Sequence, residues 1–326
     1  MHYNFLIIGS NFARVHLWAI KKVFTNSNLS ICSPNINKKY FSTKIKKYSS
    51  YKLALKKKFD FIVCATVPKI QDKVIRYIFS NKINVKYLFL EKPILDINFL
   101  IKKKKIIKNF FFDCNFIYSQ VSQWKSFKKI IKKRSFYLIN YSWFFKQAYF
   151  QNRKKTWKIL EKQGGGLVLY YLPHAIFNLV NLYPNLIYKK IFNVKFKNKI
   201  LVEINILLKK DNNPIFLKIS NFSDKNLHRL DFYNKDNKII SLSNSTRDWT
   251  KGFTIHFNNN LKLVNNKKNK NIIRLDDRKY LLLHNYKLIK NAIIAKDDYY
   301  FNKRMELIKK TFNIIYKVQK EIKNKF

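Results

Sequence analysis

The 326-residue chain has few glycines (five), prolines (six) and cysteines (three), and only 18 acidic residues. It also lacks a long apolar run near its start, because residues 5–8 lead directly into polar Ser10 and Asn11. A secretory signal needs a longer apolar core, so we expect no signal peptide and a cytoplasmic location. The most apolar later stretch, residues 166–183, contains Pro173 and His174 and makes a poor membrane span. We therefore expect no membrane span.

The few cysteines indicate the redox environment. Cys32, Cys64 and Cys114 fall within apolar runs of strand length in the first third of the chain. Their number is odd and they are scattered, which is typical of reduced core thiols rather than of a disulfide framework. This interpretation agrees with a cytoplasmic location.

The scarcity of acidic residues gives a formal net charge of +49. Such a charge would usually indicate a nucleic acid or an anionic surface as partner. Proteins that read base edges favour arginine for its bidentate contacts, whereas the cations here are mostly lysines. Lysine, Asn, Ile, Phe and Tyr are enriched together, and A- and T-rich codons explain that bias without a binding function. We expect no specific nucleic-acid partner.

Five apolar runs of strand length alternate with helical patterns in the first part of the chain. The runs span residues 5–8, 29–32, 60–65, 85–90 and 110–116. The helical patterns between them end near residue 24 and span residues 51–58, 66–79 and 95–108. This alternation predicts a doubly wound parallel sheet with helices on its faces. We expect a first domain over residues 1–117.

A degenerate phosphate-binding loop follows the first run. A strand, a glycine turn and a helix N-terminus make the usual dinucleotide phosphate site. Only Gly9 of the usual three glycines is present, with Asn11 at the second position. Asn tolerates a left-handed backbone better than most residues, so the turn remains possible. The candidate cofactor contacts here are Gly9, Ser10, Asn11, Phe12 and Ala13.

The end of the second run bears on the choice between NAD and NADP. An acidic residue usually stands there and binds the ribose 2′-hydroxyl of NAD, but this chain has Ser33, with Lys38 and Lys39 nearby. A hydroxyl and cations suit a 2′-phosphate, which favours NADP. The alternative is an ordinary turn at Ser33.

The run 85–90 ends abruptly at Glu91-Lys92-Pro93. In open α/β sheets, ligands bind at the carboxyl ends of the strands. A lysine held there by a rigid strand and a proline can polarise or protonate a bound group. The alternative is a solvated lysine in a turn, because the chain is rich in lysine.

The pattern changes after residue 117. A helix near residues 122–133, a strand over 135–145 and an apolar helix over 167–182 come first. Strand-length runs separated by polar turns follow without helices between them, at residues 200–208, 215–219 and 230–233. This pattern predicts a mostly antiparallel sheet, followed by closing helices over residues 286–323. The expected fold is an N-terminal Rossmann-type doubly wound parallel sheet plus a C-terminal α+β domain over residues 118–326.

Several motifs recur in an order typical of one family. Gly164-Gly165-Gly166 precedes His174 by eight residues, and Trp157 stands shortly before the glycines. Together with Glu91-Lys92-Pro93, these motifs resemble the glucose–fructose oxidoreductase / inositol dehydrogenase family (Gfo/Idh/MocA) over nearly the whole chain. The resemblance implies an NAD(P)-dependent oxidoreductase that acts on sugars, nucleotide sugars or cyclitols. It also implies a C-terminal domain whose open sheet often mediates oligomers, so we expect a homo-oligomer.

The resemblance also implies site residues. His174 would be the general base or acid at the reacting hydroxyl, and Lys92 would polarise the same oxygen. Trp157 and Lys158 would contact the substrate, and Thr66, Glu91 and Lys92 would lie near the cofactor. The resemblance implies no metal site.

One departure concerns the residue four positions before the histidine, which is acidic in the family and is Tyr170 here. On a helix, Tyr170 and His174 would share a face, so Tyr170 is a third candidate catalytic residue. Tyrosine can donate a proton but cannot supply a fixed negative charge. This change and the missing loop glycines leave an alternative open: a catalytically impaired member that acts as a binding or assembly subunit.

Overall fold

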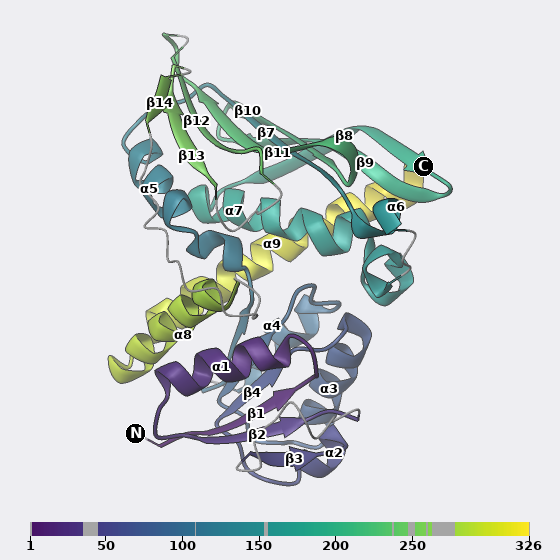
Figure 1. Cartoon of the computed structure of the whole chain (residues 1–326), viewed down its shortest axis with the longest axis vertical. Coiled ribbons are helices and arrows are strands. Elements are labelled where there is room, and N and C mark those ends of the chain that lie inside the picture. Colours follow the sequence, from purple (N-terminus) through teal and green to yellow (C-terminus); the bar gives the residue numbers. More distant parts are fainter. Residues whose placement is uncertain are drawn as a thin grey trace. The chain divides into compact units, whose positions relative to one another are not determined.

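The computed structural model describes residues 2–34, 45–107, 109–152, 156–236, 238–246, 252–258, 260–262 and 278–325. The chain forms two compact units (Figure 1). The first comprises Met1–Ile117 and Arg274–Lys309, and the second comprises Tyr118–Ile273 and Lys310–Phe326. The segment Arg274–Lys309, which the sequence analysis assigned to the second domain, therefore clusters with the first unit.

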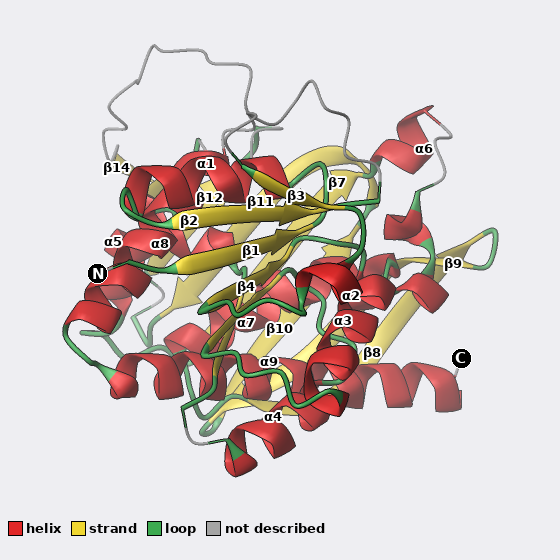
Figure 2. Cartoon of the chain, turned by 90° about the horizontal axis from the view of Figure 1, so that it is seen from below, coloured by secondary structure: helices red, strands yellow, loops and turns green. Residues whose placement is uncertain are grey.

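The first unit contains a six-stranded parallel sheet in the order β3-β2-β1-β4-β5-β6. Figure 2 shows β2, β1 and β4 side by side. The strands are β1 (Asn4–Ile8), β2 (Asn28–Cys32), β3 (Lys46–Tyr48), β4 (Phe61–Cys64), β5 (Tyr87–Leu90) and β6 (Phe111–Cys114). Every residue of β4, β5 and β6 is buried, as expected for a sheet covered on both faces. The doubly wound parallel sheet is confirmed.

The sequence analysis missed strand β3. Its residues are two lysines and a tyrosine, none of them buried, so no apolar run marks it. Edge strands are commonly short and charged, and β3 lies at the edge of the sheet. The strand before Glu91 is therefore β5 rather than the fourth strand.

The helices of the first unit begin where the local sequence favours a helix start. The Ser50 side chain caps α2 by accepting a hydrogen bond from Lys52 N, and Asp96 caps α4 by accepting one from Phe99 N. Pro68 occupies the first turn of α3, where its missing N–H is tolerated. The helices are α1 (Ala13–Val23), α2 (Tyr51–Ala54), α3 (Pro68–Ser80), α4 (Ile97–Ile106) and α8 (Arg278–Ile294), with the first part of α9 (Asp298–Lys325). Helix α2 ends at Ala54 and is shorter than predicted.

The second unit contains an eight-stranded sheet in the order β14-β13-β12-β11-β7-β10-β9-β8. Only the β7–β10 pair is parallel among the pairs in the described residues, so the sheet is mostly antiparallel, as predicted. The strands are β7 (Leu138–Lys146), β8 (Ile187–Lys197), β9 (Ile200–Lys210), β10 (Asn213–Ser220), β11 (Phe222–Tyr233), β12 (Ile239–Asn244), β13 (Thr254–Phe257) and β14 (Asn260–Lys262).

Among the described residues, helices cover one face of this sheet and none covers the other (Figure 1). They are α5 (Ser122–Ile131), α7 (Leu172–Leu182) and the second part of α9, with the short α6 (Ala148–Asn152) nearby. Strand β10 shows the alternation that this arrangement requires: Ile215, Leu217 and Ile219 are buried, whereas Phe216 is exposed and Lys218 half-exposed.

The three cysteines lie at the ends of β2, β4 and β6 and are free and buried. The prediction of core thiols without a disulfide framework is confirmed. Burial raises the pKa of Cys32 to about 11 and the pKa of Cys64 further. Both thiols therefore stay protonated at neutral pH and behave as core side chains.

Candidate active site

The strands of the parallel sheet end in register. Ile8 pairs with both Cys32 and Cys64, and Leu90 pairs with both Cys64 and Cys114. The backbone hydrogen bonds continue for one more residue beyond each of these ends, at distances of 2.8–3.1 Å. This extra row consists of Ser33, Gly9, Ala65, Glu91 and Asn115, in the order of the strands. It lies at the carboxyl edge, where open α/β sheets bind ligands.

Gly9 stands in this row at a point where no other residue fits. Its φ is +137°, and a Cβ there would lie 2.3 Å from the carbonyl oxygen of Ala65. The chain therefore crosses the sheet edge with its bare backbone and leaves Ser10 and Asn11 exposed. Asn11 does not adopt a positive φ, so the turn forms without the left-handed residue that the sequence analysis considered.

Helix α1 begins directly after this turn. No side chain caps its first turn and no acidic residue lies in it. The N-terminal end of such a helix carries a partial positive charge and suits an anion. Close backbone approach at Gly9 and the small, buried Ala13 thus fit the pyrophosphate of a dinucleotide.

Ser33 and Thr66 follow the neighbouring strands β2 and β4. Ser33 is buried, and its N–H donates to the carbonyl of Tyr48 at 3.0 Å. Thr66 is half-buried, and its hydroxyl donates to the carbonyl of Val67 at 3.3 Å. Lys38 and Lys39, on which part of the NADP expectation rests, lie outside the described residues.

The Glu91 side chain is the centre of a partly buried hydrogen-bond network. Its Oε1 accepts from His16 Nε2 at 2.9 Å and from Asn115 Nδ2 at 2.5 Å. His16 is fully buried on α1, and its Nδ1 is 2.8 Å from the hydroxyl of Tyr286 on α8. Burial raises the pKa of Tyr286 well above its usual value, so this hydroxyl keeps its proton. Both ring nitrogens of His16 therefore have a hydrogen-bond partner, Glu91 at Nε2 and Tyr286 at Nδ1.

A second set of hydrogen bonds holds the backbone on both sides of Lys92. Gln71, on α3, donates from Nε2 to the carbonyls of Glu91 at 2.8 Å and Pro93 at 3.2 Å. Its Oε1 accepts from the Glu91 N–H at 3.0 Å. The Lys92-Pro93 peptide is cis, and the Lys92 side chain is half-buried. One buried amide thus fixes the turn from which Lys92 projects.

Sequence reasoning missed four residues of these networks. Asn115 had a usable signal, since it directly follows an apolar strand at the edge where ligands bind. His16 and Gln71 lie on the buried faces of their helices and look like ordinary core positions in the sequence. Tyr286 contacts a residue 270 positions away in the chain, and nothing local marks it.

In the second unit, two of the three glycines allow close packing ahead of α7. A Cβ on Gly165 would lie 2.1 Å from the carbonyl oxygen of Trp157, and one on Gly166 would lie 2.6 Å from Glu161 Cγ. Gly166 also has a φ of +79°, which favours glycine. The glycines thus let the turns around Trp157 and Glu161 pack against the start of the following helix.

The helix predicted over residues 167–182 consists of two segments, a π-helical turn and an α-helix. Leu167–Tyr171 is a π-helical turn, in which Leu172 N donates to the carbonyl of Leu167, and α7 follows. Pro173 cannot donate a hydrogen bond, and the wider i→i+5 bonding immediately precedes it. Tyr170 and His174 therefore do not lie on one continuous α-helix.

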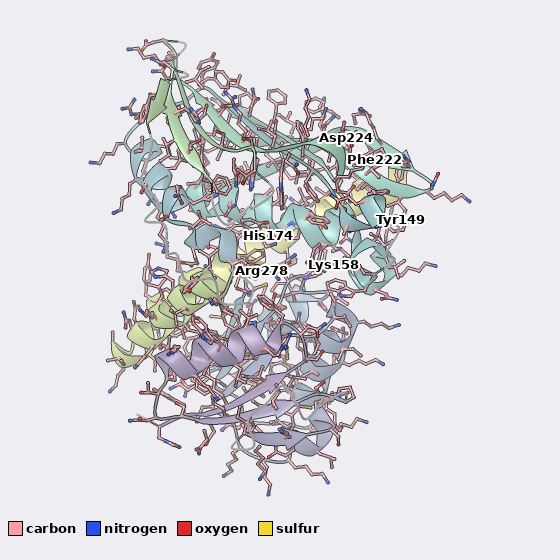
Figure 3. The ribbon with its side chains drawn as sticks, viewed as in Figure 1. Tyr149, Lys158, His174, Phe222, Asp224 and Arg278 are labelled. Carbon is pink, nitrogen blue, oxygen red and sulfur yellow. The ribbon has the colours of Figure 1, made fainter. Side chains whose placement is uncertain are left out.

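The candidate residues of the second unit form two aromatic clusters. The Tyr170 ring lies edge-on to Trp157, with centroids 5.2 Å apart, and Lys158 Nζ lies 5.4 Å from the Tyr170 centroid. His174 is buried on α7, whereas exposed Lys158 precedes the glycines (Figure 3). The His174 ring lies edge-on to Tyr118, with centroids 4.5 Å apart. The structure thus brings Trp157, Lys158 and Tyr170 together, and it places His174 next to the rings of Tyr118 and Trp143.

No protein-family model matches the sequence, and comparison with curated proteins finds no match either. Solved structures do match over nearly the whole chain. UDP-N-acetylglucosamine 3-dehydrogenase from Acidithiobacillus ferrooxidans has a TM-score of 0.72 at 12% identity, covering 98% of each chain. The WlbA dehydrogenase from Chromobacterium violaceum, in complex with NADH and UDP-GlcNAcA, has a TM-score of 0.75 at 11% identity, covering 99% of this chain and 94% of that one.

A myo-inositol dehydrogenase from Corynebacterium glutamicum has a TM-score of 0.67 at 13% identity, covering 98% of this chain and 97% of that one. The chain has the fold of Gfo/Idh/MocA-type dehydrogenases. The fold expected from the motifs is therefore confirmed. Among the described residues, no helix is long and apolar enough to cross a membrane.

Proposed function

We propose that this protein is an NAD(P)-dependent oxidoreductase that transfers a hydride between a nicotinamide cofactor and a hydroxyl or keto carbon of a sugar, nucleotide sugar or cyclitol. The observation that carries the proposal is the row at the carboxyl edge of the parallel sheet. There Gly9 brings bare backbone to the start of α1, and a hydrogen-bonded turn presents Lys92. The fold supports the same function, because the solved structures named above are dehydrogenases.

The cofactor contacts in this proposal come from the first unit. The loop Gly9, Ser10, Asn11, Phe12 and Ala13 holds the pyrophosphate, and Ser33, Thr66, Glu91 and Lys92 line the rest of the cofactor site. A bound nicotinamide supplies or accepts the hydride. The residues of this chain bind it, orient it and move protons at the substrate.

Proton transfer is assigned to Lys92 and His174. Lys92 polarises or protonates the reacting oxygen, and His174 acts as general base or acid, the role that histidine fills most often. The aromatic rings around His174 limit access of water to it. Trp157 and Lys158 contact the substrate, and Tyr170, which packs against both, supplies a hydroxyl in place of the family's acidic residue.

A nucleotide sugar is the substrate class we would test first, because the WlbA structure holds UDP-GlcNAcA beside NADH. Activity should be assayed with UDP-sugars, free sugars and inositols, each with NAD and with NADP. Turnover with any of them supports the proposal. Cofactor binding without turnover across the panel would contradict it.

A catalytically impaired binding or assembly subunit is the second candidate. It is favoured by the single glycine of the phosphate loop and by Tyr170 at the position of the family's acidic residue. Fluorescence titration with NADH and NADPH separates the two functions. No binding of either at about millimolar cofactor supports the second candidate, whereas saturable binding together with turnover supports the oxidoreductase.

The preferred cofactor in this proposal is NADP. A carboxylate after β2 would repel a 2′-phosphate, and Ser33 removes that repulsion. One charge-assisted contact to the phosphate is worth about 1.5–3 kcal/mol, or about tenfold or more in affinity. NADP should therefore bind at least as well as NAD. Clearly tighter binding of NAD would show that the inference from Ser33 is wrong.

We also propose a cytoplasmic homo-oligomer formed through the open face of the second sheet. The free, buried cysteines suit a reducing compartment. Phe192 on β8 and Phe216 on β10 are both exposed, and their rings stack with centroids 5.7 Å apart. Sedimentation analysis should show an oligomer, and Phe192→Lys with Phe216→Lys should shift it toward the monomer. A monomeric wild-type protein would contradict this part of the proposal.

A further inference from the structure

Gln71 is the buried residue whose hydrogen bonds no ordinary core role explains. It is 1% exposed, and both ends of its amide are engaged with backbone on either side of Lys92. The Gln71 amide bonds to two carbonyls and one N–H of the same turn, and these use nearly all of the hydrogen bonds that it can form. A leucine of similar size would fill the space but leave those carbonyls without these donors.

The chemistry of the three contacts specifies an amide. The turn offers two carbonyls, from Glu91 and Pro93, and the Glu91 N–H, which Gln71 Oε1 shares with the carbonyl of Cys64 at 3.1 Å. A group that fits must therefore accept once and donate twice. A glutamine side chain does this, whereas an ionised glutamate only accepts and would face two carbonyl oxygens.

The turn between these contacts contains Lys92. Its side chain projects from a backbone segment that Gln71 holds at Glu91 and at Pro93. Because the contacts come from one rigid helix, α3, they fix the turn relative to the sheet edge. Small displacements of a catalytic group are costly when the reacting atoms must be aligned.

We propose that Gln71 is a positioning residue for Lys92: its buried amide holds the Glu91–Lys92–Pro93 turn in the geometry that Lys92 needs to act on the reacting oxygen. The inference rests on the proposed function for the role of Lys92. The claim that Gln71 holds the turn does not depend on that function. The two claims can therefore be tested separately.

The first test uses Gln71→Leu and Gln71→Glu, with Gln123→Leu as matched control. Gln123 is 2% exposed on α5 of the second unit, so its replacement makes the same chemical change at similar burial. Gln71→Leu should lower kcat by about tenfold or more, as expected for the loss of two or three hydrogen bonds. Gln123→Leu should leave kcat within about twofold.

Gln71→Glu supplies a signature that a purely structural role would not give. Its protonated carboxyl accepts from Glu91 N–H and donates to one carbonyl, whereas its ionised form cannot donate. The kcat ratio of Gln71→Glu to wild type should therefore rise as pH falls, and burial brings this transition up toward neutral pH. The ratio for Gln71→Leu should not change with pH. A flat ratio for Gln71→Glu, or a Gln71→Leu kcat within about twofold of the control, would overturn the proposal.

The second test needs no activity. Hydrogen exchange, followed by mass spectrometry on a peptide covering residues 91–94, reports directly on the turn. In Gln71→Leu its exchange should speed up by about tenfold or more, while peptides from β9 keep the wild-type rate. Unchanged exchange in the turn would overturn the proposal whether or not the enzyme turns over. If the wild-type protein shows no turnover, the proposed function fails, and the exchange result alone decides whether Gln71 holds the turn.

Discussion

Two fully buried histidines, one in each unit, have different surroundings. His16 is hydrogen-bonded through both ring nitrogens, to Glu91 and to Tyr286. His228, on β11, stacks with Tyr141 and with Trp143 and bonds through Nε2 to the Tyr141 hydroxyl, while its Nδ1 has no hydrogen-bond partner within the described part of the chain. The first histidine lies in a polar network that reaches the sheet edge. The second is enclosed by aromatic side chains.

The two rings differ in how their hydrogen-bonding groups are met. Buried polar groups are costly unless their hydrogen bonds are satisfied, and the network around Glu91 satisfies both nitrogens of His16. Around His228, stacking and burial stabilise a neutral ring. His174 is buried against the rings of Tyr118 and Trp143 and lies on α7, and its catalytic role is a prediction from the motif resemblance. The predictions that follow test these assignments.

The largest effect is expected for His174→Ala. Loss of a general acid–base group typically costs on the order of 10²–10⁴ in rate, and kcat should fall by that amount. Cofactor affinity, measured by fluorescence, should stay unchanged. Turnover within about twofold of wild type would show that His174 is a core histidine like His228.

Lys92→Met should lower kcat by a factor on the order of 10² or more, because it removes the charge and the proton that the proposal places at the reacting oxygen. Exposed Lys69, on α3, provides the control: Lys69→Met should leave kcat and KM near wild type. If both variants behave alike, Lys92 is one of the many solvated lysines of this chain, and the network around it has another role.

Part of this site could be predicted from sequence and part could not. Gly9 and Lys92 were found because each follows an apolar strand, and a parallel sheet brings such ends to one edge. The contacts that hold Lys92 come from residues distant in the chain, for which periodicity carries no signal. The packing of α8 and the first part of α9 in the first unit likewise has no local sequence signal. Arg304 on α9 contacts Asp113, 191 positions away, with a closest distance of 2.8 Å. Local pattern predicts elements and their ends, whereas such pairings depend on the packing of the whole unit.

The burial of His228 should make the free energy of unfolding depend on pH in the acidic range. Burial lowers the pKa of His228 to about 3, from about 6.5 when exposed. Below about pH 6.5 the unfolded state therefore binds a proton that the folded state excludes, and the free energy of unfolding falls by up to about 1.4 kcal/mol per pH unit. The loss should continue as the pH falls toward the pKa of the folded state.

His228→Phe keeps an aromatic ring at this position but cannot titrate. Its free energy of unfolding, measured by denaturant titration between pH 7 and pH 5, should lose the part of the pH dependence due to this histidine. The constant cost of leaving the Tyr141 hydroxyl without this acceptor does not affect the slope. An identical slope in both proteins would mean that folding does not lower the pKa of His228.

The smallest effects are expected within the His16 network. Tyr286→Phe removes one hydrogen bond and should lower the free energy of unfolding by about 1 kcal/mol, and His16→Leu should lower it by about 2–3 kcal/mol because it frees both Glu91 and Tyr286. The double variant should cost less than the sum, since the residues act as one network. Strict additivity would show that they do not.

The most direct test of the central claim is transfer of deuterium from substrate to cofactor. A UDP-sugar, a free sugar and an inositol, each deuterated at its oxidisable carbons, are incubated with the enzyme and NAD or NADP, and the nicotinamide is analysed by mass spectrometry. The account predicts deuterium on the reduced nicotinamide with at least one of them, and its loss with His174→Ala. Saturable cofactor binding with no deuterium transfer from any of these substrates would contradict it.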